Sequence, residues 1–307
     1  LCSGRYGTYP QQKVSGLSGV DSWQCAYLAG LMLSGFMDAV VDLAVQAGNR
    51  LLEYQKVGRR VVASSKSASR DLVTQADLES EEILKTGLAT LFPKDGILAE
   101  ESGSCRNGEA VWMLDPLDGT VNFVHGLPMW AVSIARVDSL GPSLAVVPLP
   151  RLGETFTAIR GEGAFCNGSR LKVSDADCLG DALLATGFPY RRHLLADNNL
   201  ENFCRLFLHQ RGIRRMGSAA VDLAYTAAGR LDVFWELHLQ PYDVAAGGLL
   251  VVEAGGEVGT LRPGGDWIRN GNIVAGAGPL VAELRDILSK NQPEGWPFLD
   301  DVEERES

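Results

Sequence analysis

Two aspartates in the segment WMLDPLDGTVNF, residues 112–123, have the types and the spacing of a candidate metal site. Asp115 and Asp118 follow an apolar run typical of a strand, and only Pro116 and Leu117 separate them. Because proline restricts the backbone between them, both carboxylates and the carbonyl of Leu117 can converge on one point, and hard divalent cations prefer such oxygen ligands. The alternative is an Asp-rich turn with a helix cap, for which Asp-Gly-Thr is ordinary. The spacing alone leaves both interpretations open.

Gly119 and Thr120 follow these aspartates and are candidates for contact with a phosphate. Glycine allows the backbone to approach a ligand closely, and the threonine supplies a hydroxyl group. If a helix begins here, its free N–H groups face an anion.

Two further acidic signals lie at other expected strand ends. Glu100 follows the apolar run 96–99, and Asp243 lies between a strand and an Ala/Gly-rich helix, where it is either a helix cap or a ligand. Three acidic strand ends in one chain resemble a multi-metal site, although sequence periodicity does not establish that they converge.

The elements that must position these residues alternate between helix and strand. Helical spacing of apolar residues predicts helices over residues 38–54, 77–92, 218–228, 244–253 and 280–288. Short apolar runs predict strands over 111–114, 131–136, 143–147, 231–235 and 272–274, with a tight turn at 167–168. No internal repeat or low-complexity linker divides the middle of the chain. The pattern indicates a mixed α and β architecture of layered sheets and helices.

The composition of the 307-residue chain, 46% hydrophobic and 21% charged, is that of a globular protein with a substantial core. Its 38 acidic and 28 basic residues give a formal charge of −10, which argues against bulk binding of nucleic acid or of an anionic membrane. Residues 291–307 hold six acidic residues and one arginine, and are expected to form a solvated acidic tail. Much of the remaining excess lies in the candidate site residues.

The cysteines and the first 35 residues bear on the cellular compartment. The six cysteines are scattered without a C-x-x-C pair, so neither a zinc site nor a disulfide framework is expected, and a reduced cytoplasmic location is favoured. Residues 1–35 are expected to be a poorly ordered extension. The uncharged stretch 25–37 is shorter than the roughly 20 apolar residues that span a bilayer, but the core of a signal peptide remains an alternative.

Several blocks in matching order resemble the inositol monophosphatase family, the Mg²⁺-dependent and Li⁺-sensitive phosphomonoesterases. They are DLVTQAD at 71–77, EES at 100–102, DPLDGT at 115–120, GAFCNG at 163–168, GSAAVDLAY at 217–225 and YDVAAGGLLVVEAGG at 242–256. The resemblance covers residues 36–290. It implies a layered α-β-α-β-α sandwich of the inositol monophosphatase and fructose-1,6-bisphosphatase type, with subdomains at about 36–178 and 179–290, and a homodimer.

The resemblance also implies residue roles. The family's ligands for two to three Mg²⁺ ions, for which Mn²⁺ is a possible substitute, fall on Glu100, Asp115, the carbonyl of Leu117, Asp118 and Asp243. The position of Asp77 pairs with that of Thr120 to orient the attacking water, with Glu100 also in a catalytic role. The phosphate is expected on the N–H groups of Gly119 and Thr120. Ser218, Ala219 and Glu236 match positions that contact the alcohol portion of the substrate.

For two sets of charged residues the sequence allows both a role at the site and a purely structural role. Glu236 favours a polyol because a carboxylate accepts two hydroxyl hydrogen bonds, but it also fits a charged residue that ends a strand. The basic pairs Arg191-Arg192 and Arg214-Arg215 are interpreted as surface or dimer contacts rather than as phosphate ligands.

The sequence favours inositol 1-phosphate as the substrate. The blocks GFPYR at 187–191 and RRMGSAAVDLAY at 214–225 look most like bacterial-type inositol-1-monophosphatases. Alternative substrates of the same superfamily are histidinol phosphate, fructose 1,6-bisphosphate, NADP and 3′-phosphoadenosine 5′-phosphate. A regulatory partner role independent of catalysis is also open, because some bacterial relatives act in transcription complexes.

Overall fold

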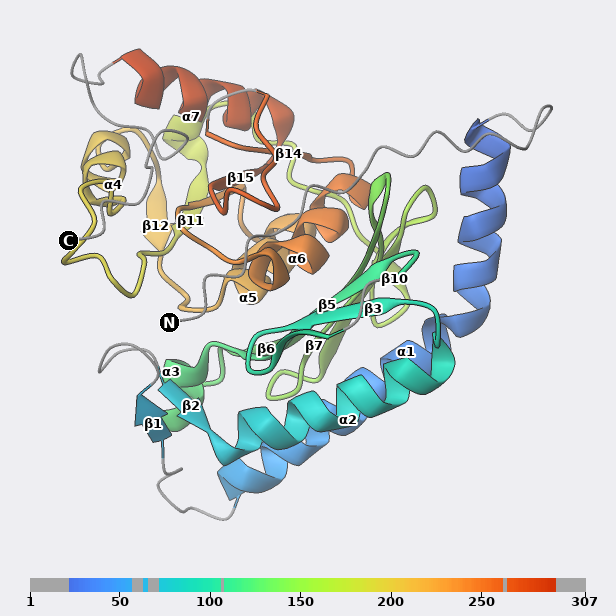
Figure 1. Cartoon of the computed structure of the whole chain (residues 1–307). Coiled ribbons are helices and arrows are strands. Elements are labelled where there is room, and N and C mark those ends of the chain that lie inside the picture. The colour runs from blue at the N-terminus through green and yellow to red at the C-terminus, as the bar shows by residue number, and fades with distance from the viewer. Residues whose placement is uncertain (1–21, 57–62, 66–71, 106–107, 262–263, 291–307) are drawn as a thin grey trace, which may run out of the picture.

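The computed structural model describes residues 22–56, 63–65, 72–105, 108–261 and 264–290. Two sheets alternate with three layers of helices, and Figure 1 shows α1 and α2 along one face of the larger sheet and α7 beyond the smaller one. The arrangement is the layered α-β-α-β-α sandwich that the sequence predicted. The expected acidic tail, 291–307, and residues 1–21 of the expected extension lie outside the described residues.

The first helical layer consists of α1 (Ser22–Lys56) and α2 (Gln75–Leu91). In α1 the buried residues Val40, Ala44, Ala47 and Leu51 recur at intervals of one helical turn, which is why this face packs against the sheet. The helix expected over residues 38–54 is thus part of a longer one, and residues 22–35 of the expected extension are helical. None of the described helices combines the length and the apolar character that crossing a membrane requires.

The larger sheet has eight strands in the order β10-β9-β8-β7-β6-β5-β3-β4. Their bounds are β3 Gly96–Ala99, β4 Gly103–Cys105, β5 Val111–Asp118, β6 Ala131–Asp138, β7 Gly141–Leu149, β8 Glu154–Ile159, β9 Gly163–Cys166 and β10 Ser169–Arg170. The pair β3 and β5 is parallel, so both strands end at the same edge, which is where Glu100 and Asp115 lie. A separate pair, β1 (Ala63–Ser65) and β2 (Leu72–Thr74), precedes α2.

The middle layer consists of α5 (Ala219–Ala227) and α6 (Pro241–Glu253). Both helices are rich in alanine and are buried on nearly every side, because they lie between the two sheets. Gly247 of α6 faces Leu223 of α5 at a distance that leaves no room for a Cβ, so the small residue brings the two helices together. This close packing fixes the N-termini of both helices relative to the end of β5.

The smaller sheet has five strands in the order β12-β11-β13-β15-β14. They are β11 Leu183–Thr186, β12 Gly212–Arg214, β13 Val233–Glu236, β14 Glu257–Gly259 and β15 Ile273–Gly276. The outer layer, α4 (Leu200–Leu206) and α7 (Gly278–Lys290), covers the face away from α5 and α6 through Leu280, Val281 and Leu284. The predicted subdomain boundary near residue 178 falls between the last strand of the larger sheet and the first of the smaller.

Candidate active site

A cavity of about 510 Å³ opens where the end of β5 faces the N-termini of α5 and α6. The sequence-predicted residues that line it are Glu100, Asp115, Leu117, Asp118, Gly119, Thr120, Ser218, Ala219, Glu236 and Asp243. Asp77 is the one predicted site residue that does not line the cavity; it is fully buried at the start of α2 and lies beside Thr120. The structure therefore brings together residues that are up to 166 positions apart, from Asp77 to Asp243.

Asp115 and Asp118 lie at a register shift in β5. Asp115 pairs with Ser133 of β6 and Asp118 pairs with Ala131, so three steps along β5 match two steps along β6. In a regular strand, residues three apart point to opposite faces of the sheet, but the extra residue of a bulge restores them to one side. The bulge at Pro116 and Leu117 is thus what places both aspartates on the cavity.

The backbone of the bulge is held by side chains. The N–H of Leu117 donates to Asp115 Oδ1 at 2.9 Å, and Ser80 Oγ of α2 donates to the carbonyl of Pro116 at 2.9 Å. Thr120 Oγ1 lies 3.1 Å from the carbonyl oxygen of Leu117 and 3.4 Å from Asp77 Oδ1. One hydroxyl proton serves only one of these acceptors at a time, so Thr120 can exchange partners without moving far.

Gly119 begins α3 (Thr120–Val124) with a φ of 94°, a left-handed conformation that favours glycine. A Cβ at this position would come within 3.0 Å of the carbonyl oxygen of Met129 and 3.2 Å of the Ser218 side chain. Both the backbone angle and the close approach of Ser218 therefore require glycine between Asp118 and Thr120.

Asp118 links the larger sheet to the N-terminus of α5. Its Oδ2 accepts hydrogen bonds from Ser218 Oγ at 2.7 Å and from the N–H of Ala220, in the first turn of α5, at 2.6 Å. Ser218 is the N-cap residue of α5, and its Oγ also lies 3.3 Å from the N–H of Val221. A carboxylate at a helix N-terminus is stabilised by the unpaired N–H groups there, so this geometry is a favourable one.

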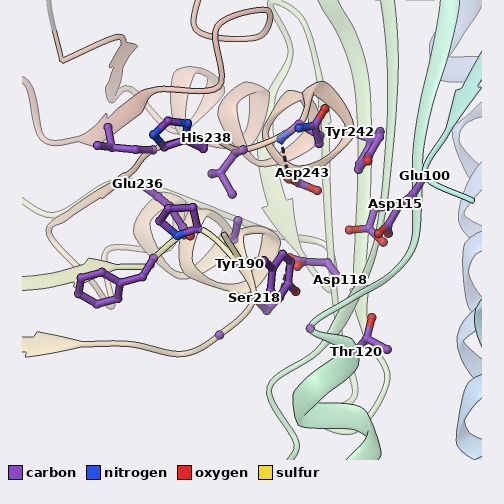
Figure 2. Close-up of a pocket in the computed structure, with 18 of the residues that line it drawn as sticks. Glu100, Asp115, Asp118, Thr120, Tyr190, Ser218, Glu236, His238, Tyr242 and Asp243 are labelled. Atoms are coloured by element: carbon purple, nitrogen blue, oxygen red, sulfur yellow. Dashed lines mark hydrogen bonds between the residues drawn. The ribbon is translucent and has the colours of Figure 1, made fainter. Parts of the chain in front are cut away.

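Asp243 and Glu100 complete the acidic end of the cavity. Asp243 lies in the first turn of α6, and its Oδ2 accepts the N–H of Gln240 at 2.7 Å, so the residue closes the helix terminus and also lines the cavity. Glu100 directly follows β3, and its N–H donates to the carbonyl of Leu114 at 3.1 Å. Figure 2 shows the carboxylates of Glu100 and Asp115 side by side, with Asp118 and Asp243 facing them from across the cavity.

Burial and mutual repulsion destabilise the charged forms of these acids. Burial, followed by the charges of Glu100, Asp118 and Asp243, raises the pKa of Asp115 well above its ordinary value. Burial likewise raises the pKa of Asp118 to about 6, although the hydrogen bonds from Ala220 and Ser218 oppose the shift. The pKa of Asp243 is raised by burial and then by the charge of Asp118. An added cation at this end of the cavity would relieve that repulsion.

The donor set fits a hard divalent cation. Within the described ranges, no three Asp, Glu, His or Cys side chains already converge as metal ligands, because several of the carboxylates are engaged with backbone N–H or hydroxyl donors. The acidic end of the cavity nevertheless offers four carboxylates and the carbonyl of Leu117, while the fifth carboxylate of the cavity, Glu236, and its imidazole, His238, lie at the other end. Oxygen-only donors of high negative charge select Mg²⁺, Ca²⁺ or Mn²⁺ over zinc or copper.

Glu236 lies at the opposite end of the cavity from Glu100 and Asp115 (Figure 2). It ends β13 and is only 8% exposed. Burial raises the pKa of its carboxyl to about 8, while the charge of Arg215 opposes and that of Asp118 adds to the shift. The carboxylate packs directly on Gly187, whose carbonyl oxygen accepts Asn199 Nδ2 at 2.7 Å. A buried carboxyl at a cavity wall can accept hydrogen bonds from a polar ligand.

Twelve of the residues that line the cavity were not predicted as site residues, among them Tyr190, Arg191, Arg215 and His238. Tyr190 and Arg191 come from the segment between β11 and α4, Arg215 follows β12, and His238 follows β13. Arg191 and Arg215, interpreted from the sequence as surface or dimer contacts, line the cavity wall. The sequence signal for Tyr190, Arg191 and Arg215 was their place inside the blocks GFPYR and RRMGSAAVDLAY, whereas His238 lies in neither block.

The arrangement separates two chemical tasks. One end gathers acidic oxygens that suit a divalent cation and a phosphate group, with the N–H groups that begin α3 and the Thr120 hydroxyl close by. The other end carries a buried carboxyl and further polar side chains that suit an organic alcohol. No covalent nucleophile is needed for such a site, because water activated by a cation can attack a phosphorus atom.

Comparison with known proteins shows a similarity that extends over most of the chain. The model of the inositol monophosphatase family matches residues 32–292. The Nus factor SuhB of Escherichia coli strain K12 is 42% identical over 259 residues, which cover 82% of this chain and 97% of that protein. The inositol-1-monophosphatase of Mesorhizobium japonicum is 40% identical over 260 residues, covering 84% of this chain and 97% of that protein.

A solved structure shows the same fold. The crystal structure of the extragenic suppressor protein suhB from Bartonella henselae superposes with a TM-score of 0.77 and 39% sequence identity, over 84% of this chain and 100% of that one. The family match covers more than half of the chain, and both sequence relatives exceed 30% identity over most of it. The chain therefore belongs to the inositol monophosphatase family.

Proposed function

We propose that this protein is a Mg²⁺-dependent phosphomonoesterase that hydrolyses inositol 1-phosphate to inositol and phosphate. The observation that carries the proposal is that Glu100, Asp115, Asp118 and Asp243 all line one end of a single cavity, with Glu236 at the other end. A phosphate monoester is a dianion, so a cavity lined by bare carboxylates repels it. The same cavity attracts it once divalent cations have reversed the local charge.

The cations would be held by Glu100, Asp115, the carbonyl of Leu117, Asp118 and Asp243. We propose two to three Mg²⁺ ions, with Mn²⁺ as a possible substitute. When bound, such ions neutralise phosphoryl oxygens, lower the pKa of a water molecule and stabilise a leaving alkoxide. The Asx-type hydrogen bond from Leu117 N–H to Asp115 keeps the Leu117 carbonyl and the Asp115 carboxylate in a fixed relation to each other.

Thr120 and Asp77 would position the attacking water. The Thr120 hydroxyl already lies between Asp77 Oδ1 and the Leu117 carbonyl, at 3.4 and 3.1 Å. With Asp77 as the acceptor of the threonine proton, the Thr120 oxygen is free to accept a hydrogen bond from water. The N–H groups of Gly119 and Thr120 would bind phosphoryl oxygens, because they begin a helix and have no preceding turn within it.

The alcohol portion of the substrate would contact Ser218, Ala219 and Glu236. Ala219 and Ser218 are nearly fully buried at the start of α5 and give the cavity a wall with little flexibility. Glu236 supplies an acceptor for hydroxyl groups. This combination favours a polyol over an apolar alcohol, and it supports inositol 1-phosphate ahead of histidinol phosphate, fructose 1,6-bisphosphate, NADP or 3′-phosphoadenosine 5′-phosphate.

The test is phosphate release from these five substrates by the purified full chain, with Mg²⁺ and with EDTA. We expect turnover only with Mg²⁺, inhibition by Li⁺, and a kcat/KM for inositol 1-phosphate at least as high as for the others. A preference of roughly tenfold for another substrate, about 1.4 kcal/mol in the barrier, would replace inositol 1-phosphate as the substrate. The homodimer implied by the resemblance is tested in the same preparation by light scattering.

A second candidate function rests on the name of one relative. The protein of Escherichia coli that is 42% identical to this chain is named a Nus factor, so a regulatory role that needs no catalysis is the alternative. The test uses a strain from which the gene for this protein has been deleted. Complementation of that strain by the Asp115→Asn variant, which lacks one central carboxylate, would favour the regulatory role. Failure to complement by a folded variant favours the enzyme.

A further inference from the structure

His238 has a backbone conformation that is uncommon for a residue other than glycine. Its φ is 62°, in the left-handed region where a Cβ crowds the following carbonyl oxygen. The other non-glycine residues with positive φ in the described ranges are Asn167 and Asn199, and asparagine tolerates this region through local hydrogen bonds. Of these residues only His238 lines the cavity. Backbone strain that persists at a cavity wall points to a use for the side chain.

The surroundings of His238 fix the orientation of its ring. Its backbone N–H donates to Asn272 Oδ1 at 3.2 Å, and its ring Nε2 lies 2.7 Å from the carbonyl oxygen of Asp197. A carbonyl oxygen only accepts hydrogen bonds, so Nε2 must carry the proton. The neutral ring then presents its lone pair on Nδ1, which makes no hydrogen bond to any residue that the structure describes.

The position of His238 relates it to the alcohol end of the cavity. It lies two residues after Glu236, and Figure 2 shows both on the side away from Glu100 and Asp115. An acceptor nitrogen and a carboxylate two residues apart on one wall match two hydroxyl groups of a single ligand. Glycine would adopt this φ without strain, but it would supply no acceptor.

We propose that His238 is a specificity-determining residue whose Nδ1 accepts a hydrogen bond from a hydroxyl group of a polyol phosphate, beside the one that Glu236 accepts. This inference rests on the proposed phosphomonoesterase function and adds to it the residue that distinguishes a polyol from an alcohol without further hydroxyl groups. The competing role is that of a cation: a doubly protonated His238 would instead bind a second phosphate group.

The experiment compares kcat/KM for inositol 1-phosphate with kcat/KM for phenyl phosphate, whose alcohol portion has no further hydroxyl group, in saturating Mg²⁺. For His238→Ala we expect the ratio of the two constants to fall roughly 3- to 10-fold, the effect of one lost hydrogen bond between neutral groups. For His238→Gly we expect the same fall together with a higher midpoint of thermal unfolding, because glycine relieves the backbone strain.

The glycine variant keeps the test valid if alanine at a φ of 62° lowers stability too far. Asn167→Gly is the matched control, because it also replaces a positive-φ residue with glycine but lies in the turn between β9 and β10; its ratio should equal that of the wild type. If the ratio of kcat/KM for inositol 1-phosphate to that for phenyl phosphate is unchanged in both His238 variants, the inference about His238 is overturned and the proposed function is not. If the His238 variants lose kcat/KM selectively for fructose 1,6-bisphosphate, the inference is overturned in favour of a doubly protonated His238 that binds a second phosphate group. A wild-type protein inactive on every substrate overturns the proposed function and this inference with it.

Discussion

The carboxylate of Glu236 lies directly against the α-carbon of Gly187, so closely that a Cβ at residue 187 would overlap both of its oxygens. Gly187 is held in place against Glu236 by hydrogen bonds. Its carbonyl oxygen accepts a hydrogen bond from Asn199 Nδ2 at 2.7 Å, and Asn199 Oδ1 accepts one from Trp235 Nε1 at 2.9 Å. Gly187 therefore determines where the Glu236 carboxylate can lie in the cavity.

For Gly187→Ala we expect Glu236 to be displaced, with KM for inositol 1-phosphate raised about tenfold or more. Overpacking of a buried site should also lower the free energy of unfolding by about 1–3 kcal/mol. Steady-state kinetics and denaturant unfolding measure both effects. Gly180→Ala is the control, because a Cβ there would meet only Cys178 Sγ, at an ordinary 3.6 Å. A Gly187→Ala protein with wild-type KM would show that Glu236 does not contact the substrate.

Asp118→Asn should remove a metal ligand and retain the fold. Asparagine keeps an acceptor for Ser218 and Ala220, and it removes the buried charge whose burial, with the repulsion of Glu100, raises the pKa of Asp118 to about 6. We expect kcat to fall roughly 100-fold or more, since even the outer partners of metal ligands contribute 10- to 100-fold. In EDTA, the thermal midpoint should be no lower than that of the wild type, and Mg²⁺ should no longer raise it.

The control for this variant is Asp181→Asn, which removes an exposed carboxylate that pairs with Arg211 at 2.8 Å, away from the cavity. It should retain both turnover and the stabilisation by Mg²⁺. Near-wild-type phosphatase activity in Asp118→Asn would refute the metal assignment.

Thr120→Val tests the positioning of water. The substitution keeps the volume of this buried side chain but removes the hydroxyl that lies between Asp77 and the Leu117 carbonyl. We expect kcat to fall about 100-fold, within the range for a lost proton-transfer or positioning group, with a loss of about 1 kcal/mol in stability. Thr120→Ser should recover most of the activity. Equal activity of the valine and serine variants would exclude a role for the hydroxyl.

The stability of the metal-free protein should depend on pH through Glu236. Burial raises its pKa to about 8 against an unfolded value near 4.5, so the folded state binds this proton more tightly than the unfolded state. The associated stability is fully present below about pH 4.5 and is lost as pH rises toward 8. Nearby Asp118 and buried Asp222, whose pKa values are also raised, act in the same direction, and Arg215 opposes them.

Urea unfolding in EDTA at several pH values measures this dependence. We expect the unfolding midpoint of the wild type to fall between pH 5 and 8, and Glu236→Gln to flatten the upper part of that fall. An identical pH profile in the two proteins would mean that Glu236 is ionised without cost in the folded state.

The sequence predicted the acidic end of the site because its residues occur in compact motifs. Asp115, Asp118, Gly119 and Thr120 lie in one segment, and a strand end followed by a helix start leaves few ways to arrange them. Glu100 and Asp243 could be placed beside them only through the family resemblance, because nothing in their local sequence says which edge of the sheet they share.

The other end of the cavity could not be predicted in the same way. Gly187, Arg215 and His238 are ordinary loop residues in the sequence, and they meet only because β11, β12 and β13 lie side by side in the smaller sheet. The parallel pairing of β11 with both neighbours depends on distant segments, so no local pattern indicates it.

One element that was missed and one boundary that was misplaced show the limits of local sequence patterns. β8 (ETFTAI) was not predicted because a charge and two threonines interrupt its apolar run, yet its central position in the sheet supplies hydrogen bonds from both sides. The long α1 was expected to begin near residue 38, since the uncharged stretch before it has no polar face to reveal a helical period.

The extra residue in β5 also determines which changes of chain length the family scaffold can tolerate at this point. A single-residue deletion between Asp115 and Asp118 would return β5 to regular pleating and leave both carboxylates on one face, but it would remove the bulge that places the carbonyl of Leu117 between them. A single-residue insertion that kept the bulge would turn one of the two carboxylates to the opposite face of the sheet. Insertions and deletions should therefore occur in the connections between strands. The number of residues between Asp115 and Asp118 should stay constant even where the residues themselves change.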